Sequence, residues 1–393
     1  MTEPFDKVDP TPTDWSGEAM RRRIRGRYRA ERRFRLIGLA AVLLSAGFLA
    51  FLVGTMLING ARGFTSTEIR IDLTPAQSAM IAAGDYEGVV GRDNASLFSQ
   101  AAWLRLREAG ASAGAVSLPA ADAIDVAAKG DGNAQAERTY ARLAAEGRVR
   151  TGVNWTFLTG ADATDPTVVG IWGAFKGSLL TMIVTLALAF PIGVLSAVYL
   201  EEYAPRNRWT DMIEVSINNL AAVPSIIFGL LGLAIFLNLM HLPRSAPLVG
   251  GITLALMTMP VIVIAGRNAI KSVPPSIRDA ALGIGASRIQ VVFHHVIPLA
   301  LPGILTGTII GMARALGETA PLLMIGMRAF IASPPGGLDD PATALPVQIF
   351  LWSDEVSRGF VEKTSAAIIV LLIFLLAMNG LAIYLRNRFE KRW

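Results

Sequence analysis

Cysteine is absent from this sequence of 393 residues, and histidine occurs only three times. Without cysteine, neither a disulfide framework nor a cysteine-ligated metal site can form. Charged side chains are also scarce, at 17% of the residues, whereas hydrophobic ones make up 52%. This balance, with a mean hydropathy of +0.47, is too apolar for a soluble protein of this length and indicates a membrane protein.

A nucleotide-binding loop is absent as well. The pattern Gly-x-x-x-x-Gly-Lys-Ser/Thr, whose backbone holds phosphates, does not occur. The nearest fragment, Lys176-Gly-Ser178, lacks the upstream glycine and opens an apolar segment. The chain is therefore not expected to be an enzyme or to hold a cofactor, and if ATP drives it, another subunit must bind the nucleotide.

Six apolar segments are near or above the roughly 18 to 20 residues that cross the hydrocarbon core of a bilayer. The predicted spans are Leu36–Ile58, Gly177–Leu200, Leu220–Met240, Leu248–Gly266, Val296–Met327 and Thr364–Leu385. The first is too long for the apolar core of a secretory signal and follows a long basic segment, so it is interpreted as an uncleaved anchor. The predicted fold is an all-α polytopic membrane protein with six transmembrane helices.

The positive charges predict the orientation of these spans. Nine arginines lie between Arg21 and Arg35, and a basic run beside an apolar span is typical of a topology signal rather than of a nucleic-acid site. We therefore expect residues 1–35 and the C-terminus in the cytoplasm, and no nucleic-acid partner. The other segments expected inside contain Arg206, Arg208, Arg267, Lys271, Arg278, Arg288, Arg386, Arg388, Lys391 and Arg392.

Residues 59–170, after the anchor at 36–58, have the composition of a small soluble domain, which is expected on the outer side. Hydrophobic and charged residues alternate from Glu68 to Leu73, as in a strand with one buried face. Residues 101–108 are predicted to form a helix closed by Gly110. The segment is thus predicted to be a small α+β extracytoplasmic domain inserted after the first helix.

Catalytic chemistry is not expected in this domain, because it contains no histidine or cysteine. Asp122 and Asp125 offer paired carboxylates for acid–base work in principle. Following Ser117-Leu-Pro-Ala120, they are instead predicted to lie in a solvated loop or to cap a helix. Docking or assembly is the role we expect for the domain.

The inner loop at 268–295, within the helical part at 171–393, carries the most informative pattern. It contains Ser272-Val-Pro-Pro-Ser-Ile-Arg-Asp-Ala-Ala-Leu-Gly-Ile-Gly-Ala286. Small alanines let a short helix seat closely against another protein, and glycine permits the sharp turn that follows. The alternative is an ordinary amphipathic loop helix.

This loop resembles that of ABC-importer permeases, in which Glu-Ala-Ala, three residues, Gly, nine residues and Ile-x-Leu-Pro form a coupling helix. The matching positions are Asp279, Ala280, Ala281, Gly285 and His295-Val-Ile-Pro298. Asp replaces Glu, His replaces Ile, and Ile replaces Leu. The resemblance implies a six-helix permease fold in which Asp279, Ala280, Ala281, Gly285 and Pro298 contact a partner ATP-binding subunit, itself expected to be dimeric.

Two further motifs resemble the phosphate-specific permeases of the PstA type over residues 171–390. They are Ala222-Val-Pro-Ser-Ile-Ile-Phe-Gly-Leu230 and Ala313-Arg-Ala-Leu-Gly-Glu-Thr-Ala-Pro321. The resemblance implies phosphate import across the cell inner membrane, a second and different permease subunit, and a periplasmic phosphate-binding protein. Sulfate and molybdate permeases carry strings similar to Arg-Ala-Leu-Gly-Glu, so a related oxyanion such as sulfate, molybdate or phosphonate stays open.

Arg314, Glu318 and Thr319 are the candidate residues of the substrate path. An ionised group within an apolar span costs about 2.5 to 3.5 kcal/mol on insertion scales, so it should face a partner or a watery path. At positions i and i+4, Arg314 and Glu318 are expected to share one helix face and to pair. The guanidinium fork suits phosphate oxygens. The alternative is a structural salt bridge that only stabilises the fifth span.

Other polar residues near the spans have structural interpretations. Glu214, Asn218 and Asn219 are expected to bond across helices or to face the inner water layer, with membrane lipid nearby. His294 and His295 are adjacent and therefore point apart on a helix, which favours interface packing over a metal pair. A membrane enzyme or a sensor would need a catalytic set or a signalling module, and neither pattern is found.

Overall fold

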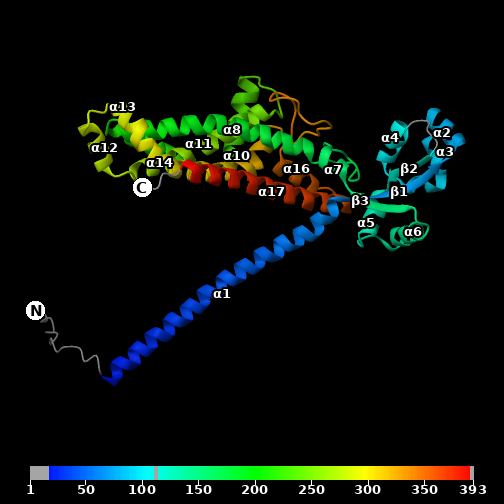
Figure 1. Ribbon diagram of the computed structural model, residues 1–393, viewed down its shortest axis with the longest axis horizontal. Coiled ribbons are helices and arrows are strands. Elements are labelled where there is room, and N and C mark those ends of the chain that lie inside the picture. The colour runs from blue at the N-terminus through cyan, green and yellow to red at the C-terminus, as the bar shows by residue number, and fades with distance from the viewer. Residues whose placement is uncertain (1–16, 110–113, 390–393) are drawn as a thin grey trace, which may run out of the picture. The chain divides into compact units, whose positions relative to one another are not determined.

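The computed structural model describes residues 17–109 and 114–389 (Figure 1). Residues up to Thr55 and residues from Met56 onward form two separate compact units. Three positions named above, Gly110, Lys391 and Arg392, lie outside the described residues, as do residues 1–16 of the basic N-terminal segment.

The described chain is mainly helical and contains three strands. Helix α1 (Glu18–Gly63) makes up the described part of the first unit and continues into the second. The α+β part contains β1 (Thr65–Leu73), α2 (Pro75–Ala82), α3 (Tyr86–Val90), the 3-10 helix η1 (Arg92–Leu97), α4 (Gln100–Ala109), β2 (Gly114–Pro119), α5 (Asp122–Ala128), α6 (Ala134–Ala145) and β3 (Val149–Val153). The helical part contains α7 (Trp155–Thr159), α8 (Trp172–Val198), α9 (Arg208–Ala221), α10 (Ser225–Gly232), α11 (Pro247–Lys271), α12 (Pro275–Gly283), α13 (Arg288–Gln290), α14 (Ile297–Gly317), α15 (Ala320–Met324), α16 (Leu345–Ser353) and α17 (Arg358–Phe389). Three π-helical segments, η2 (Tyr199–Tyr203), η3 (Leu233–Leu239) and η4 (Val291–Val296), adjoin α8, α10 and α14.

Within the described residues, five helices are long and apolar enough to cross a membrane, and a bent pair can supply a sixth span. The five are Met20–Gly63, Trp172–Tyr203, Pro247–Lys271, Arg288–Gly317 and Arg358–Arg388. The prediction of an all-α polytopic fold with a small α+β insertion is confirmed.

The third predicted span, Leu220–Met240, is not a straight helix. Helix α9 ends at Ala221, and the next helical segment, Ser225–Leu239, is bent from it by 99°. The break falls at Pro224, which lacks an N–H group and disfavours helical backbone at the residue before it. Glu214, Asn218 and Asn219 therefore lie on a separate helix, α9.

The fifth predicted span, Val296–Met327, is also interrupted. Helix α14 ends at Gly317, and Glu318 adopts an extended conformation with φ −79° and ψ 124°. Pro321 cannot donate the backbone hydrogen bond that would continue the helix through this point. The expectation that Arg314 and Glu318 share one helix face is therefore wrong, although their side chains do meet.

Small residues let the helices of the apolar core approach closely. Helix α11 packs on α8 and on α14, and α14 also packs on α17 (Figure 1). A Cβ atom on Gly251 of α11 would collide with the side chain of Val184 on α8, and one on Gly307 of α14 would collide with Ala265 on α11. These glycines let the helix backbones approach, as is common in membrane proteins.

The α+β domain is a three-stranded antiparallel sheet of order β2-β1-β3 with helices packed on it. Ile69 of the predicted strand is fully buried and Leu73 nearly so, which confirms the alternation read from the sequence. Asp125 is 7% exposed and accepts a hydrogen bond from the backbone N–H of Thr67 at 2.7 Å. Of the two predicted settings, the solvated loop is wrong and the helix start is nearly right, because Asp122 and Asp125 lie in the first turn of α5, although the N-cap itself is Ala121.

Buried charges attach this domain to the start of α17. The Nζ of Lys129 lies 2.7 Å from Asp125 and 2.8 Å from Glu362, and all three side chains are at most 10% exposed. Lys363 donates to the carbonyl oxygen of Gly63 at 2.9 Å. These contacts link the domain to the start of α17, and removal of one member would leave uncompensated buried charge.

Replacing Asp122 with asparagine is expected to flatten the pH dependence of stability. Burial raises the pKa of the Asp122 carboxyl, against the lowering effect of the hydrogen bond from Ser357. The folded state thus binds this proton more tightly, so the associated stability is present at low pH and lost as the pH rises through the raised pKa. In thermal unfolding in detergent, the melting temperature of Asp122→Asn relative to that of the native chain should rise as the pH increases. Parallel pH profiles would contradict this.

Candidate coupling surface and translocation site

The loop at 268–295 forms a short helix, a turn and the start of a second helix. Helix α12 begins with Pro275 at its first position, where the missing N–H group costs nothing. After it, Gly285 has φ +89°, a left-handed conformation that favours glycine. Ser287 and Gln290 then form a capping box that starts α13. The local sequence therefore explains both the helix and the turn.

The structure brings four of the five predicted coupling residues together on this loop. Asp279 and Ala280 are exposed on α12, and Ala281 is 4% exposed and faces the core. Gly285 occupies the turn, where a Cβ would meet no atom within 4 Å. Pro298 lies in the first turn of α14, beside a pocket next to the loop. Ala281 thus anchors the helix while its neighbours face outward.

Arg278 holds α12 in place, a role the sequence reasoning missed. Its Nη2 lies 2.7 Å from the Oε1 of Glu202 on η2, and its guanidinium also donates to the carbonyl oxygens of Val273 and Ile270. Four charge-assisted contacts on one guanidinium fix the start of the helix. The available signal was the pair Glu201-Glu202 at the end of an apolar span, which needs a cation near it.

A second ionic group lies beside the first. Arg267 on α11 contacts Glu214 on α9 at 2.8 Å and Glu201 on η2 at 3.4 Å, and Lys271 lies 3.6 Å from Glu201. Glu201 on η2 therefore connects to α11 directly and to α9 through Arg267. The adjacent Glu202 connects η2 to the loop helix α12 through Arg278.

The loop exposes large apolar side chains. Ile284 is 83% exposed, and the others are Leu282 at 47%, Ile289 at 64% and Phe293 at 48%. Apolar side chains gathered on one segment mark a surface that contacts another protein or a membrane.

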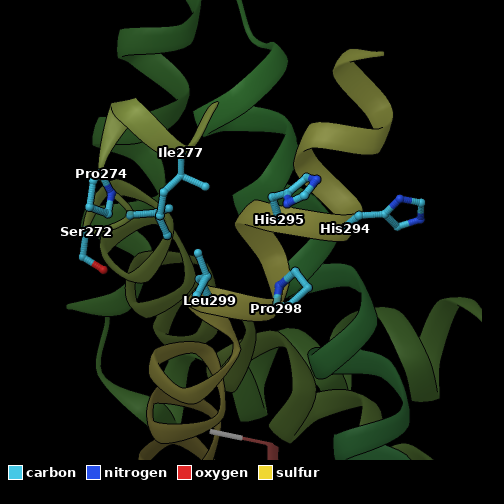
Figure 2. A pocket seen from close by; sticks show the side chains of 8 residues that line it. Ser272, Pro274, Ile277, His294, His295, Pro298 and Leu299 are labelled. Atoms are coloured by element: carbon cyan, nitrogen blue, oxygen red, sulfur yellow. The ribbon is translucent and has the colours of Figure 1, made fainter. Parts of the chain in front are cut away.

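A half-open pocket of about 700 Å³ lies between the start of α12 and the start of α14. Figure 2 shows Ser272, Pro274 and Ile277 on one side and His294, His295 and Pro298 on the other. The two imidazole rings point in different directions, as adjacent positions require. Within the described residues, no cluster of three or more histidine or carboxylate side chains is suited to hold a metal ion.

The predicted substrate-path residues lie at the break between α14 and α15. The Nε of Arg314 is 3.4 Å from the Oε1 of Glu318, with the Arg314 side chain 45% exposed and that of Glu318 19% exposed. Thr319 precedes α15 and its side chain makes no cap hydrogen bond there. Among the described residues, the terminal nitrogens of Arg314 have no hydrogen-bond partner.

The two motifs that were singled out in the third and fifth segments contact each other. Helix α10 packs on α15, and a Cβ on Gly229 would lie 2.6 Å from the Cα of Pro321 and 2.9 Å from the Cβ of Met324. The glycine thus permits close approach of the two short helices beside the break at Glu318.

We expect Gly229→Ala to destabilise the protein by about 1 to 3 kcal/mol, because the added methyl group meets backbone and forces the helices apart. Gly317→Ala is the matched control, since a Cβ at that position would meet no atom within 4 Å and the change should be neutral or slightly stabilising. Thermal unfolding of the purified variants in detergent measures both. Equal stability of the two would show that the α10–α15 contact is loose.

In the comparison with known protein families, the helical part and the N-terminal part of the chain match two different family models. Residues 171–393 match the family described as binding-protein-dependent transport system inner membrane component. Residues 21–109 match a domain of unknown function, DUF3333.

Individual relatives cover parts of the chain. It is 35% identical over 172 residues to the probable ABC transporter permease protein YqgI of Bacillus subtilis (strain 168), covering 44% of this chain and 58% of that protein. It is 34% identical over 156 residues to the phosphate transport system permease protein PstA 1 of Mycobacterium tuberculosis (strain CDC 1551 / Oshkosh), covering 40% and 51%. It is 30% identical over 210 residues to the phosphate transport system permease protein PstA of Haemophilus influenzae (strain ATCC 51907 / DSM 11121 / KW20 / Rd), covering 53% and 73%.

The chain thus spans little more than half the length of the first two relatives. Among solved structures, an inward-facing MetNI methionine ABC transporter matches at 15% identity with a TM-score of 0.44, over 56% of this chain and 95% of that one.

Proposed function

Since the chain belongs to the family of inner membrane components of binding-protein-dependent transport systems, we propose that it is the permease subunit of an ATP-driven importer of inorganic phosphate. The names of the PstA relatives support phosphate as the substrate. The chain is a multi-pass inner membrane protein, with both termini proposed to be cytoplasmic. Its partners are an ATP-binding subunit, a second permease subunit and a periplasmic phosphate-binding protein.

The geometry of the inner loop carries this proposal. Helix α12 exposes Asp279 and Ala280 and ends in the Gly285 turn, so it presents a short, small-residue surface to the ATP-binding subunit. Arg278 ties the helix to η2 at the end of α8. A push on α12 during ATP binding therefore moves the inner ends of the spanning helices, and alternating access follows.

The break between α14 and α15 supplies the proposed phosphate contact. Arg314 offers a planar pair of donors that suits two phosphate oxygens, and Glu318 orients it. Thr319 adds a hydroxyl group next to the break. Irregular backbone inside a transporter core is typical of positions that line a cavity.

The α+β domain at 59–170 is proposed to lie outside the membrane and to serve docking or assembly. Its buried connection to α17 through Lys129 and Glu362 supports this, because a partner bound to the domain would act directly on a spanning helix.

The test is anion-stimulated ATP hydrolysis by the assembled transporter in liposomes. Complexes containing this chain are supplied with the binding protein loaded with phosphate, sulfate, molybdate or a phosphonate. Stimulation by phosphate alone is expected. Stimulation by another oxyanion in place of phosphate would reassign the substrate. Failure of the chain to co-purify with any ATP-binding subunit would contradict its role as a permease subunit.

A further inference from the structure

Helix α9 exposes an apolar face that nothing in the described chain covers. None of its residues is buried. At about 100° per residue, Trp209, Ile213 and Leu220 lie on one side of the helix, and they are 71%, 47% and 42% exposed. Met212, beside them, is 54% exposed. Asp211 and Asn218 lie on the opposite side, where Val215, 55% exposed, is the one large apolar residue.

The direction of α9 distinguishes it from the spanning helices. It is bent by 99° from the apolar segment Ser225–Leu239. If that segment crosses the bilayer, α9 lies nearly parallel to the membrane plane. A helix with one apolar face and one polar face in this orientation is suited to the boundary between headgroups and acyl chains.

The residues before and at the start of α9 match an anionic lipid surface. Arg206 and Arg208 are exposed and have no carboxylate partner among the described residues, and the aromatic rings of Tyr203 and Trp209 flank them. Aromatic rings and arginines are enriched at the headgroup level. The free guanidinium groups complement lipid phosphates, whereas a protein interface would have to supply carboxylates to them.

We propose that α9 is an interfacial helix that binds anionic phospholipid in the inner leaflet and anchors the coupling machinery to the membrane surface. Its polar side holds Glu214, which contacts Arg267, and Arg267 also contacts Glu201 next to Glu202. Glu202 in turn holds Arg278 of α12. The lipid-bound helix is thus linked by ion pairs to the loop helix. The inner-leaflet assignment rests on the orientation in the proposed function, whereas the interfacial position does not.

Single cysteines test the position of α9 without background labelling, because the chain has no cysteine of its own. The variants Trp209→Cys, Ile213→Cys and Leu220→Cys report on the apolar face, with Asp211→Cys and Asn218→Cys as matched controls on the other face. Each is spin-labelled in the assembled protein in nanodiscs, and collision with oxygen and with a water-soluble nickel complex gives its depth.

The three apolar-face labels should sit at one shallow depth, while both control labels stay in water. Positions 209 and 220 are about 16 Å apart along a helix with a rise of about 1.5 Å per residue. If the depth of the labels instead changed steadily from position 209 to position 220 by about 16 Å, α9 would cross the membrane. Labels shielded from both reagents would mean that a protein partner covers the face. Either result overturns the proposal.

Lipid choice tests the charge argument. A bimane label on Ile213→Cys is quenched by brominated phosphatidylglycerol or brominated phosphatidylcholine, and their competition gives the preference for the anionic lipid. Arg206→Gln with Arg208→Gln should lower that preference by on the order of 5-fold for each arginine at low ionic strength. The control Arg138→Gln with Arg142→Gln removes the same charge from exposed positions on α6 and should have no effect. An equal loss in the control pair, or no loss in the first pair, would contradict anionic-lipid binding.

Discussion

Gly285→Asp is expected to leave the protein inserted and assembled but to abolish coupling between ATP hydrolysis and transport. The backbone at Gly285 has φ +89°, which strains any added side chain, but a Cβ there would meet no atom within 4 Å, so the change creates no clash within this chain. The new carboxylate would instead point into the proposed contact with the ATP-binding subunit. An unpaired charge buried in an interface costs about 2 to 5 kcal/mol, which corresponds to roughly a 30-fold loss or more.

Gly285→Asn is the matched control for that experiment. Asparagine has nearly the same shape as aspartate and tolerates the left-handed conformation, but it carries no charge. Transport and phosphate-stimulated ATP hydrolysis should both survive in the asparagine variant and fail in the aspartate variant. Normal transport by Gly285→Asp would show that the turn does not seat against a partner, and it would remove the main argument for the coupling role of the loop.

Arg314→Lys is expected to reduce phosphate uptake strongly without loss of assembly. Lysine keeps the charge but replaces a planar fork with a point charge. A hydrogen bond to a charged group contributes about 1.5 to 3 kcal/mol, so loss of one phosphate contact should lower uptake by roughly 10- to 100-fold. Arg328→Lys, at another exposed arginine beyond α15, is the control and should transport normally. Radiolabelled phosphate uptake into liposomes measures both variants.

A purely structural role for the Arg314–Glu318 pair predicts a different result. The side chain of Arg314 is 45% exposed and the Nε–Oε1 distance is 3.4 Å, so the pair by itself should contribute no more than about 1 kcal/mol. The double variant Arg314→Leu with Glu318→Leu should therefore assemble normally and fail to transport. If it transports as well as the native chain, the pair only links α14 to the following turn, and the substrate site lies elsewhere.

Much of the fold follows from composition along the chain. The spans were predictable because a bilayer requires long uninterrupted apolar segments, and the strand part from Glu68 to Leu73 because burial alternates along an extended backbone. The breaks were harder to place. Pro224 and Pro321 were visible in the sequence, yet prolines also occur inside the continuous helices α8, α11 and α14, at Pro191, Pro260 and Pro302.

The residues of the candidate site likewise fall into those that the sequence predicted and those that it did not. The short helix with Asp279 and Ala280, and the turn at Gly285, depend on residues close together in the chain, so their spacing was sufficient to predict them. The partner of Arg278 was not predictable, because Glu202 lies 76 positions away. Asp125 was misjudged for the same reason, since it is buried against the backbone N–H of Thr67, 58 positions away, and its cation Lys129 also contacts Glu362 of the last helix.

By itself, the sequence determined that this is a membrane protein, where its apolar segments lie and which loop carries the motif that resembles a coupling helix. These properties depend on local apolar length, charge and backbone preference. Only the tertiary structure decided that α9 turns by 99° from the next segment, that Gly229 packs against Pro321, and that buried charges attach the α+β domain to α17. Those features arise where distant segments meet, because desolvated charges and close-packed backbones are stabilised only by partners that folding brings to them.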